Sequence, residues 1–199
     1  MDLAQHYLDE IRRQLRGHKR LAEGALAQVT DEQLLAILDP ESNSLAVLIK
    51  HIAGNMRSRF TDFLNSDGEK PDRHRDEEFE LDGEVTRAEL MRWWEEGWAV
   101  VNRALDSLKP QDVLKTVYIR EEPHTVLQAL NRALAHYAFH IGQIVFLAKH
   151  LGTHHWQTLS VPRGQSEEFN RKMVEQRRQT GTAVGSKASR ELCPKVREC

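Results

Sequence analysis

The sequence predicts an all-α protein built as a four-helix bundle. Three observations lead to this class: four long segments place apolar residues at helical spacing, most connections between them are short, and turn-forming residues separate them. A short additional helix is expected beside the bundle. We expect the bundle to occupy residues 1–170. Residues 171–199 are polar and rich in Arg, Gln, Thr, Gly and Ser, which predicts a disordered tail.

The first long helix is expected over about residues 3–27. Its apolar residues recur at steps of three, four or six: Leu3, Tyr7, Ile11, Leu15, Leu21 and Ala25. Thr30 then begins the short helix, because Gln33 lies three residues later and completes a capping box. Pro40 ends this stretch.

The second long helix is expected to begin near Ser44 and to end near Asn65, which starts an Asn-Ser-Asp-Gly stop signal. The charged stretch 69–84 contains few aliphatic residues and is expected to form a long loop. The third long helix begins at Thr86, where Glu89 completes a second capping box.

Residues 115–126 differ from the helical segments because they are rich in β-branched and aromatic side chains. They favour a small β-hairpin or two extended pieces. The fourth long helix is expected from about Val126 to Leu151. It is the most apolar of the four, and Gly152 ends it.

Composition narrows the class of protein. The chain of 199 residues is 40% apolar and 29% charged, as is usual for a soluble domain. A net charge of −2 does not favour nucleic acid as a partner. The N-terminus lacks the apolar core of a signal peptide, and no apolar run reaches the ~20 residues of a membrane span. Cys193 and Cys199 both lie at the end of the chain, so no disulfide framework is expected. These features predict a cytoplasmic protein.

The fourth helix carries the most informative histidines. His136 and His140 are four residues apart, so their side chains lie about 40° apart on one helical face, where two imidazoles can share a metal ion. A helical wheel places both at one edge of the apolar arc. The alternative is that they only pack, because His150 and His154 repeat the spacing across a predicted helix end.

His51 lies at an edge of the apolar arc of the second helix. Polar residues follow it along the same side: Ser44, Asn55, Ser58 and Asp62, with Arg59 nearby. A polar track beside a half-buried histidine predicts the wall of a cleft. His51 joins His136 and His140 in one site only if the two helices face each other, which helical wheels do not show.

Two segments of the chain resemble the DinB-like (DinB/YfiT-like) superfamily, in a branch of unknown function. NSLAVLIKHIAGNMRSRFTDFL, residues 43–64, is similar to the second helix of these proteins. PHTVLQALNR through HYAFHIGQI, residues 123–144, is similar to their fourth helix. Residues 61–70 and 159–166 also look like that branch, and the resemblance covers about residues 1–170.

The resemblance implies a four-helix bundle in which three histidines hold a divalent metal. These are one histidine of the second helix, His51, and the pair of the fourth, His136 and His140. Characterised members include S-transferases and isomerases that use bacillithiol, mycothiol or glutathione. The branch that this chain resembles has no assigned reaction, so the activity is an analogy: a fold does not determine a function.

Three imidazole ligands leave a coordination position open, which is the pattern of catalytic metal sites. A metal there lowers the pKa of a bound water or thiol, which serves hydrolysis or S-transfer respectively. Imidazole favours Zn or Ni and also suits Fe, Co or Mn. We therefore expect a metal-dependent enzyme with thiol S-transferase-like activity on a small molecule. The alternatives are a metal-dependent hydrolase, a metal-binding stress-response or interaction module without turnover, and a metal-free bundle.

Four further residues are candidates for contacts to the ligands or to an anionic substrate: Asn55, Arg59, Tyr137 and Gln143. His124 and His155, in connecting segments, are expected near the mouth of the cleft. A packing or surface role is the alternative for each of them.

The fourth helix also carries apolar side chains outside its core arc. Phe139 and Phe146 lie roughly opposite that arc, and a helix that is apolar all round is normally buried on both sides. This second stripe predicts contact with a second copy in a homodimer or with the tail. The alternative is that the loop 156–161 covers it.

Overall fold

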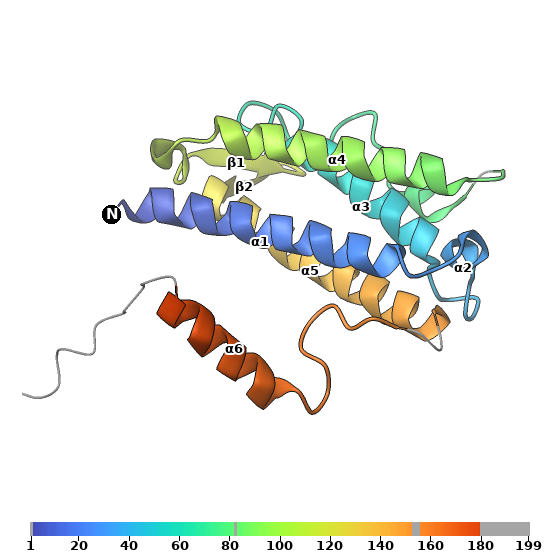
Figure 1. Cartoon of the computed structure of the whole chain (residues 1–199). Coiled ribbons are helices and arrows are strands. Elements are labelled where there is room, and N and C mark those ends of the chain that lie inside the picture. The colour runs from blue at the N-terminus through green and yellow to red at the C-terminus, as the bar shows by residue number, and fades with distance from the viewer. Residues whose placement is uncertain (1, 82, 153–155, 180–199) are drawn as a thin grey trace, which may run out of the picture. The chain divides into compact units, whose positions relative to one another are not determined.

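The computed structural model describes residues 2–81, 83–152 and 156–179, and it is a helical bundle (Figure 1). The four long helices are α1 (Leu3–Leu26), α3 (Leu45–Phe60), α4 (Arg87–Ser107) and α5 (Val126–Leu151). The shorter elements are α2 (Asp31–Leu35), the 3-10 turns η1 (Asp76–Phe79) and η2 (Pro110–Asp112), the strands β1 (Thr116–Ile119) and β2 (Glu122–Thr125), and α6 (Ser166–Gln179). The predicted class, an all-α bundle with a short additional helix and a small hairpin, is confirmed.

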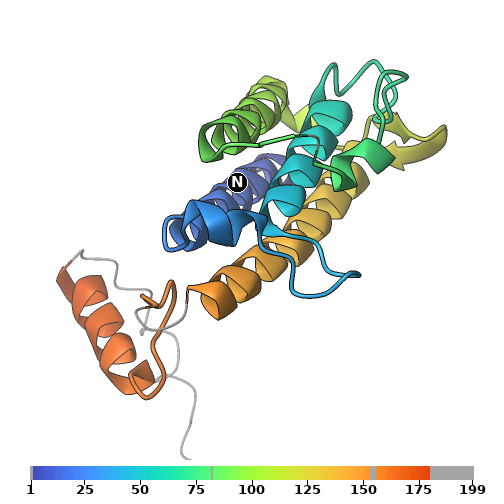
Figure 2. The same cartoon turned by 90° about the vertical axis from the view of Figure 1, so that its right-hand side faces the viewer.

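The packing of the bundle places α3 between two neighbours. It packs closely against α4 and also contacts α5, while α1 packs against α5 (Figure 2). Trp94, Trp98 and Tyr137 are fully buried in this core. Gly97 allows α4 to approach α3, because a Cβ atom there would lie 3.2 Å from the Cα atom of Ala53. The helix that carries His51 is therefore fixed from both sides.

Helix ends follow local sequence signals in most places. Both predicted capping boxes are present, at Thr30 and at Thr86, and a third begins α5 at Thr125. The predicted end of the fourth helix at Gly152 is also observed. No described helix combines the length and the apolarity that crossing a bilayer requires.

The second long helix ends earlier than its sequence predicts. We expected it to reach Asn65, but α3 ends at Phe60. Asp62 adopts a φ angle of 48°, outside the helical range, and its backbone carbonyl and side chain accept hydrogen bonds from Asn65. Asp and Asn form such local turns readily, and these compete with helix continuation. The chain therefore leaves α3 more than one helical turn earlier than expected.

The charged stretch 69–84, expected to be a loop, contains the 3-10 turn η1. This turn packs against α3. Its contact brings Glu78 and Phe79 next to His51, which the sequence did not indicate.

The β1–β2 hairpin is present, with Ile119 paired to Glu122 at its end. Its two turn residues, Arg120 and Glu121, have φ angles of 55° and 63°. A type I′ hairpin turn needs positive φ at both central positions, which usually selects Asn and Gly. Here the Asp67 carboxylate accepts both turn N–H groups, from Arg120 at 2.8 Å and from Glu121 at 2.7 Å.

Residues 1–157 form one compact unit, and residues 158–199 are grouped in a second. In the second unit, α6 spans position 170, where we expected the bundle to end and the tail to begin. Glu167 and Glu168 in its first turn and Arg177 and Arg178 in its last turn favour a helix through its dipole. Residues 180–199 lie outside the described residues, and there the predicted tail stays a prediction.

Candidate metal centre

Three histidine side chains from two helices meet at one point. His51 projects from α3 and is 4% exposed, while His136 and His140 project from successive turns of α5 and are half-buried. The Nε2 atom of His136 lies 3.3 Å from that of His51 and 3.1 Å from that of His140. The structure thus brings together the three residues that the sequence proposed as metal ligands, so that they are positioned to bind one metal ion.

The spacing of these nitrogen atoms fits a metal ion. A tetrahedral metal bound at about 2.0–2.1 Å holds two ligand nitrogens about 3.3 Å apart. The proton positions fit as well, because the Nδ1 atoms of His51 and His140 each face a carbonyl or carboxylate oxygen, at 2.8 Å. Nδ1 is therefore the donor in both rings, and the lone pairs of both Nε2 atoms face the shared point. Converging lone pairs repel one another unless a cation lies between them.

The electrostatics of the centre favour the neutral forms of His136 and His140. Burial, followed by the nearby His140 and His51, lowers the pKa of His136 to about 3. Burial also lowers the pKa of His140, against the opposing effect of its hydrogen bond with Gln143. Neutral imidazole is the form that binds a metal.

Glu78 orients His51, and the sequence did not identify it. Its Oε2 atom accepts from Nδ1 of His51 at 2.8 Å, and Arg73 donates to both carboxylate oxygens, at 2.8 and 2.9 Å. Burial alone raises the pKa of Glu78, but the hydrogen bonds from His51 and Arg73 outweigh it and lower the pKa. An ionised carboxylate behind a ligating histidine fixes the ring and makes it a stronger ligand.

Gly54 makes room for that carboxylate. A Cβ atom at Gly54 would lie only 2.4 Å from Oε1 of Glu78. Glycine inside a helix is unfavourable by about 1 kcal/mol relative to alanine, so its position one turn after His51 was a readable signal of a close contact. Its partner, in a charged loop 24 residues away, carried no comparable signal.

The other predicted candidates lie at different depths. Asn55 lines the cleft, and its Oδ1 atom accepts from the hydroxyl of Tyr137 at 3.2 Å. Tyr137 is fully buried, and burial raises its pKa, so it stays protonated and supports Asn55 from the core. Gln143 contacts His140, and Arg59 lies in the wall of the cleft.

The two loop histidines expected near the mouth are not part of this arrangement as described. His124 belongs to β2, where its Nε2 atom lies 3.5 Å from the carboxylate of Glu122, and it is not among the residues that line the cleft. His155 lies outside the described residues.

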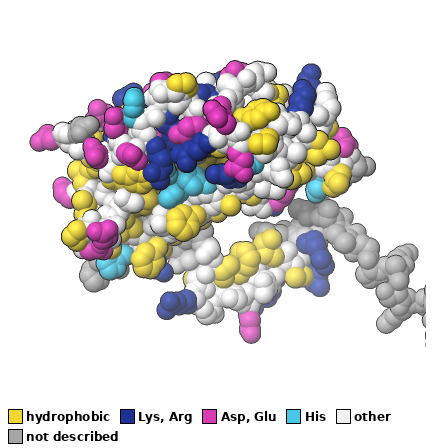
Figure 3. Space-filling model, turned by 180° about the vertical axis from the view of Figure 1, so that it is seen from behind, with side chains coloured by type: hydrophobic (Ala, Val, Ile, Leu, Met, Phe, Trp, Pro, Cys, Tyr) yellow, Lys and Arg dark blue, Asp and Glu magenta, His cyan; other side chains and the backbone are white. Residues whose placement is uncertain are grey.

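The histidines open into a cleft of about 500 Å³. Its wall combines aromatic and basic side chains, and Figure 3 shows histidine at the surface with Lys and Arg directly beside it. The aromatic residues are Phe60, Phe63, Phe79, Tyr118 and Phe139, and the basic ones are Arg59, Arg73, Arg75, Arg120 and Arg132. This volume is in the range of sites for small organic molecules.

Comparison with known proteins agrees with the extent of the bundle. Residues 2–165 match the family described as "Protein of unknown function (DUF1572)". No curated protein and no solved structure matches the chain. The match covers nearly all of the bundle and all three histidines of the centre. The chain therefore belongs to this family of unknown function.

Proposed function

We propose that the protein is a divalent-metal-dependent enzyme that acts on a small molecule in the cleft, with thiol-dependent S-transfer as its reaction. One observation carries the proposal: three imidazoles converge in the wall of an open cleft. A structural zinc site is closed by four protein ligands, whereas three ligands leave a position for a substrate. The resemblance of residues 43–64 and 123–144 to DinB-like proteins supports both the metal and the thiol.

A divalent metal at this site would supply Lewis acidity, which lowers the pKa of a thiol or water that binds it. His51, His136 and His140 would hold it, with Zn or Ni favoured and Fe, Co or Mn also suited to imidazole ligands. Glu78 and Gln143 fix the rings of His51 and His140 through their Nδ1 atoms. The aromatic wall would exclude water from the reacting groups.

The surroundings favour S-transfer over hydrolysis. Hydrolytic zinc sites such as those of metalloproteases place a glutamate beside the metal as general base. Among the residues that the structure describes, no Asp or Glu lines the cleft. The nearest carboxylate, Glu78, is held by both His51 and Arg73, behind the ligands. Five arginines in the wall would instead stabilise a negatively charged thiolate.

Metal content tests the first part of the proposal. The full chain should bind about one equivalent of Zn or Ni after reconstitution, as measured by elemental analysis. His140→Ala should lose most of this metal. His6→Ala, which changes an exposed histidine on α1, should retain it. If the reconstituted wild type contains less than about a tenth of an equivalent of any transition metal, the metal site is ruled out and the metal-free bundle is the remaining hypothesis.

Thiol consumption tests the second part. The metal-loaded chain is incubated with an electrophile and with bacillithiol, mycothiol or glutathione in turn, and loss of free thiol is followed. We expect consumption above background with at least one thiol, and its loss in His140→Ala. Metal binding without consumption would favour the non-catalytic module, and ester hydrolysis without thiol would favour the hydrolase.

A further inference from the structure

The cleft beside the three histidines carries an excess of positive charge. Five arginines line it, from four parts of the fold: α3, the stretch before η1, the hairpin turn and α5. Among the described residues no carboxylate shares that lining. A wall of one sign in a partly enclosed cleft concentrates ligands of the opposite sign.

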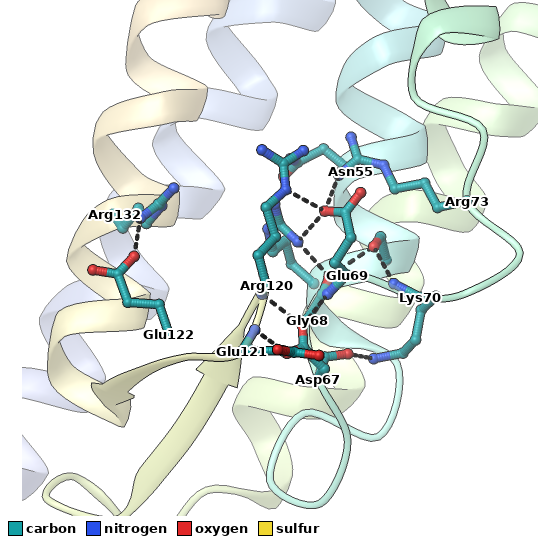
Figure 4. A network of polar contacts seen from close by, with 12 residues as sticks. Asn55, Asp67, Gly68, Glu69, Lys70, Arg73, Arg120, Glu121, Glu122 and Arg132 are labelled. Carbon is teal, nitrogen blue, oxygen red and sulfur yellow. Dashed lines mark hydrogen bonds and ion pairs between the residues drawn. The ribbon is translucent and has the colours of Figure 1, made fainter.

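One carboxylate forms ion pairs with three of these arginines. The Oε2 atom of Glu69 lies 2.8 Å from Nη1 of Arg59, 3.2 Å from Nη1 of Arg73 and 3.3 Å from Nε of Arg120. Figure 4 shows Arg73 and Arg120 beside Glu69. Arg73 also binds Glu78, and the charge of Arg59 acts on Asp67, whose carboxylate accepts the N–H groups of the hairpin turn. Arg59, Arg73 and Arg120 thus converge on one carboxylate oxygen, Oε2 of Glu69.

This crowding acts on Arg59 in particular. Burial lowers the pKa of Arg59, and although Glu69 opposes this, the charges of Arg73 and Arg120 lower it further. A second anion beside these groups would offset their mutual repulsion. An anionic group of a ligand would supply this second anion.

Arg120 is held toward the cleft by a strained turn. It and Glu121 have positive φ angles that side-chain-bearing residues adopt at a cost, and Asp67 holds both of their N–H groups. Residues kept in such conformations cluster at binding sites. The side chain of Arg120 is 54% exposed, so a ligand can reach it.

Arg132 adds a second reachable guanidinium group, from α5. Its side chain is 52% exposed, and its contact with Glu122 spans 3.9 Å between two solvent-exposed groups. Such pairs contribute little, so Arg132 is available to a ligand. Figure 4 shows Arg132 on the ribbon of α5 and Arg120 at the hairpin.

We propose that the cleft binds a small organic anion, whose carboxylate or phosphate group lies against Arg59 and Arg120, with Arg132 as a further contact. The body of the ligand would lie against the aromatic wall, and its thiol would reach the histidine centre. This inference rests on the proposed function and specifies its substrate class: an acidic thiol rather than a neutral or basic one. Guanidinium groups suit this role because their planar fork matches both carboxylate and phosphate.

Three small thiols that differ in charge test the proposal: 3-mercaptopropionate, 2-mercaptoethanol and cysteamine. The full chain is loaded with Co(II), and each thiol is titrated while the sulfur-to-cobalt charge-transfer absorption is recorded. Each variant is compared with the wild type for the same thiol, so that differences in thiol acidity cancel. Arg120→Ala should lower the affinity for 3-mercaptopropionate by about five- to tenfold, leave the affinity for 2-mercaptoethanol unchanged and raise the affinity for cysteamine. Arg132→Ala should act in the same direction but less.

Arg92→Ala is the matched control, because it removes the same charge from an exposed site on α4 outside the cleft. It should leave all three affinities unchanged. Equal effects of Arg92→Ala and Arg120→Ala would mean that only net charge matters, and would overturn the subsite. So would an Arg120→Ala variant that binds 3-mercaptopropionate as the wild type does.

A thiol-free pair separates failure of the subsite from failure of the proposed function. If no thiol gives the absorption band, the thiol reaction is wrong. Calorimetry with 3-phenylpropionate and its neutral amide on Zn-loaded protein then tests the anion subsite alone. The anion subsite is supported if the wild type binds 3-phenylpropionate more tightly than the amide and if Arg120→Ala reduces this difference. Equal affinities of the wild type for acid and amide overturn it. Phenyl phosphate as a third ligand distinguishes a preference for phosphate from one for carboxylate.

Discussion

The orientation of the His51 ring depends on a hydrogen bond to Glu78 and on the space that Gly54 leaves for that carboxylate. Its Nδ1 proton meets Glu78, and Arg73 holds that carboxylate from the other side. Gly54 leaves the space in which the carboxylate lies. Glu78 and Gly54 do not line the cleft, and they act on the centre through His51.

Glu78→Gln should weaken metal binding without unfolding the protein. The amide keeps the size of the side chain but removes the negative charge that strengthens His51 as a ligand and pairs with Arg73. We expect about a tenfold loss of Zn affinity, measured by competition with a chromophoric chelator. Thermal unfolding of the metal-free protein serves as the control. An unchanged Zn affinity would show that Glu78 does not support the ligand.

Gly54→Ala should have the same effect by displacing that carboxylate. Its Cβ atom would overlap Oε1 of Glu78, so the Glu78 side chain must move away from its place behind His51. Gly17→Ala is the matched control, because a Cβ atom there meets nothing within 4 Å in the middle of α1. The control should raise the free energy of unfolding by up to about 1 kcal/mol, while Gly54→Ala lowers Zn affinity. Equal behaviour of the two variants would contradict the steric argument.

At the scale of elements, the hairpin and the loop after α3 are hydrogen-bonded to each other at the wall of the cleft. Asp67 binds the turn, and the Gly68 N–H donates to the carbonyl of Tyr118 at 2.8 Å. Burial by itself raises the pKa of Asp67, but the N–H donors of Glu69, Glu121 and Arg120 outweigh it and lower the pKa. The ionised form therefore stabilises the folded hairpin.

Asp67→Asn should lower the free energy of unfolding by about 1 kcal/mol at pH 7, because the charged acceptor is lost at a partly exposed site. Since folding lowers the pKa of Asp67, its contribution is complete above the unfolded pKa of about 3.9. It is lost as the pH falls through the lower, folded pKa. The difference between wild type and variant, measured by urea unfolding, should therefore shrink below about pH 4. If the difference in free energy of unfolding does not depend on pH, the effect comes from the altered hydrogen-bond geometry of residue 67 and not from its charge.

At the scale of the whole molecule, α5 presents two different faces, since it carries two histidines of the centre and an apolar stripe that is exposed. Phe139 is 64% exposed and Phe146 is 72% exposed. Phe139 also lines the cleft, so a subunit packed on this stripe would lie near the entrance. The homodimer expected from the sequence stays a prediction.

Phe146→Glu tests that dimer. If two copies pack through α5, a carboxylate in the interface should shift the protein toward monomer, because burying an unpaired charge is unfavourable. Sedimentation equilibrium at several concentrations measures this. Phe146 does not line the cleft, so Zn content should not change and serves as the control. A monomeric wild type at high concentration would remove the dimer.

The sequence alone determined the architecture, because helix formation here depends on local signals. Apolar spacing, the capping boxes at Thr30 and Thr86, and the stop at Gly152 are all encoded within a few residues. The pairing of His136 with His140 is equally local, since both lie on one face of one helix. Where two local signals competed, as at Asp62, the position of a helix end was predicted wrongly.

Tertiary structure decided how these parts meet. His51 joins the pair because α3 lies next to α5, and helix periodicity carries no information about which faces pack together. Glu78 reaches His51, and the arginines from the loop and the hairpin reach the cleft, through turns that follow no sequence period. The local sequence thus determined the helices and the histidine pair on α5. Long-range packing assembled the three-histidine centre and the charged wall of the cleft.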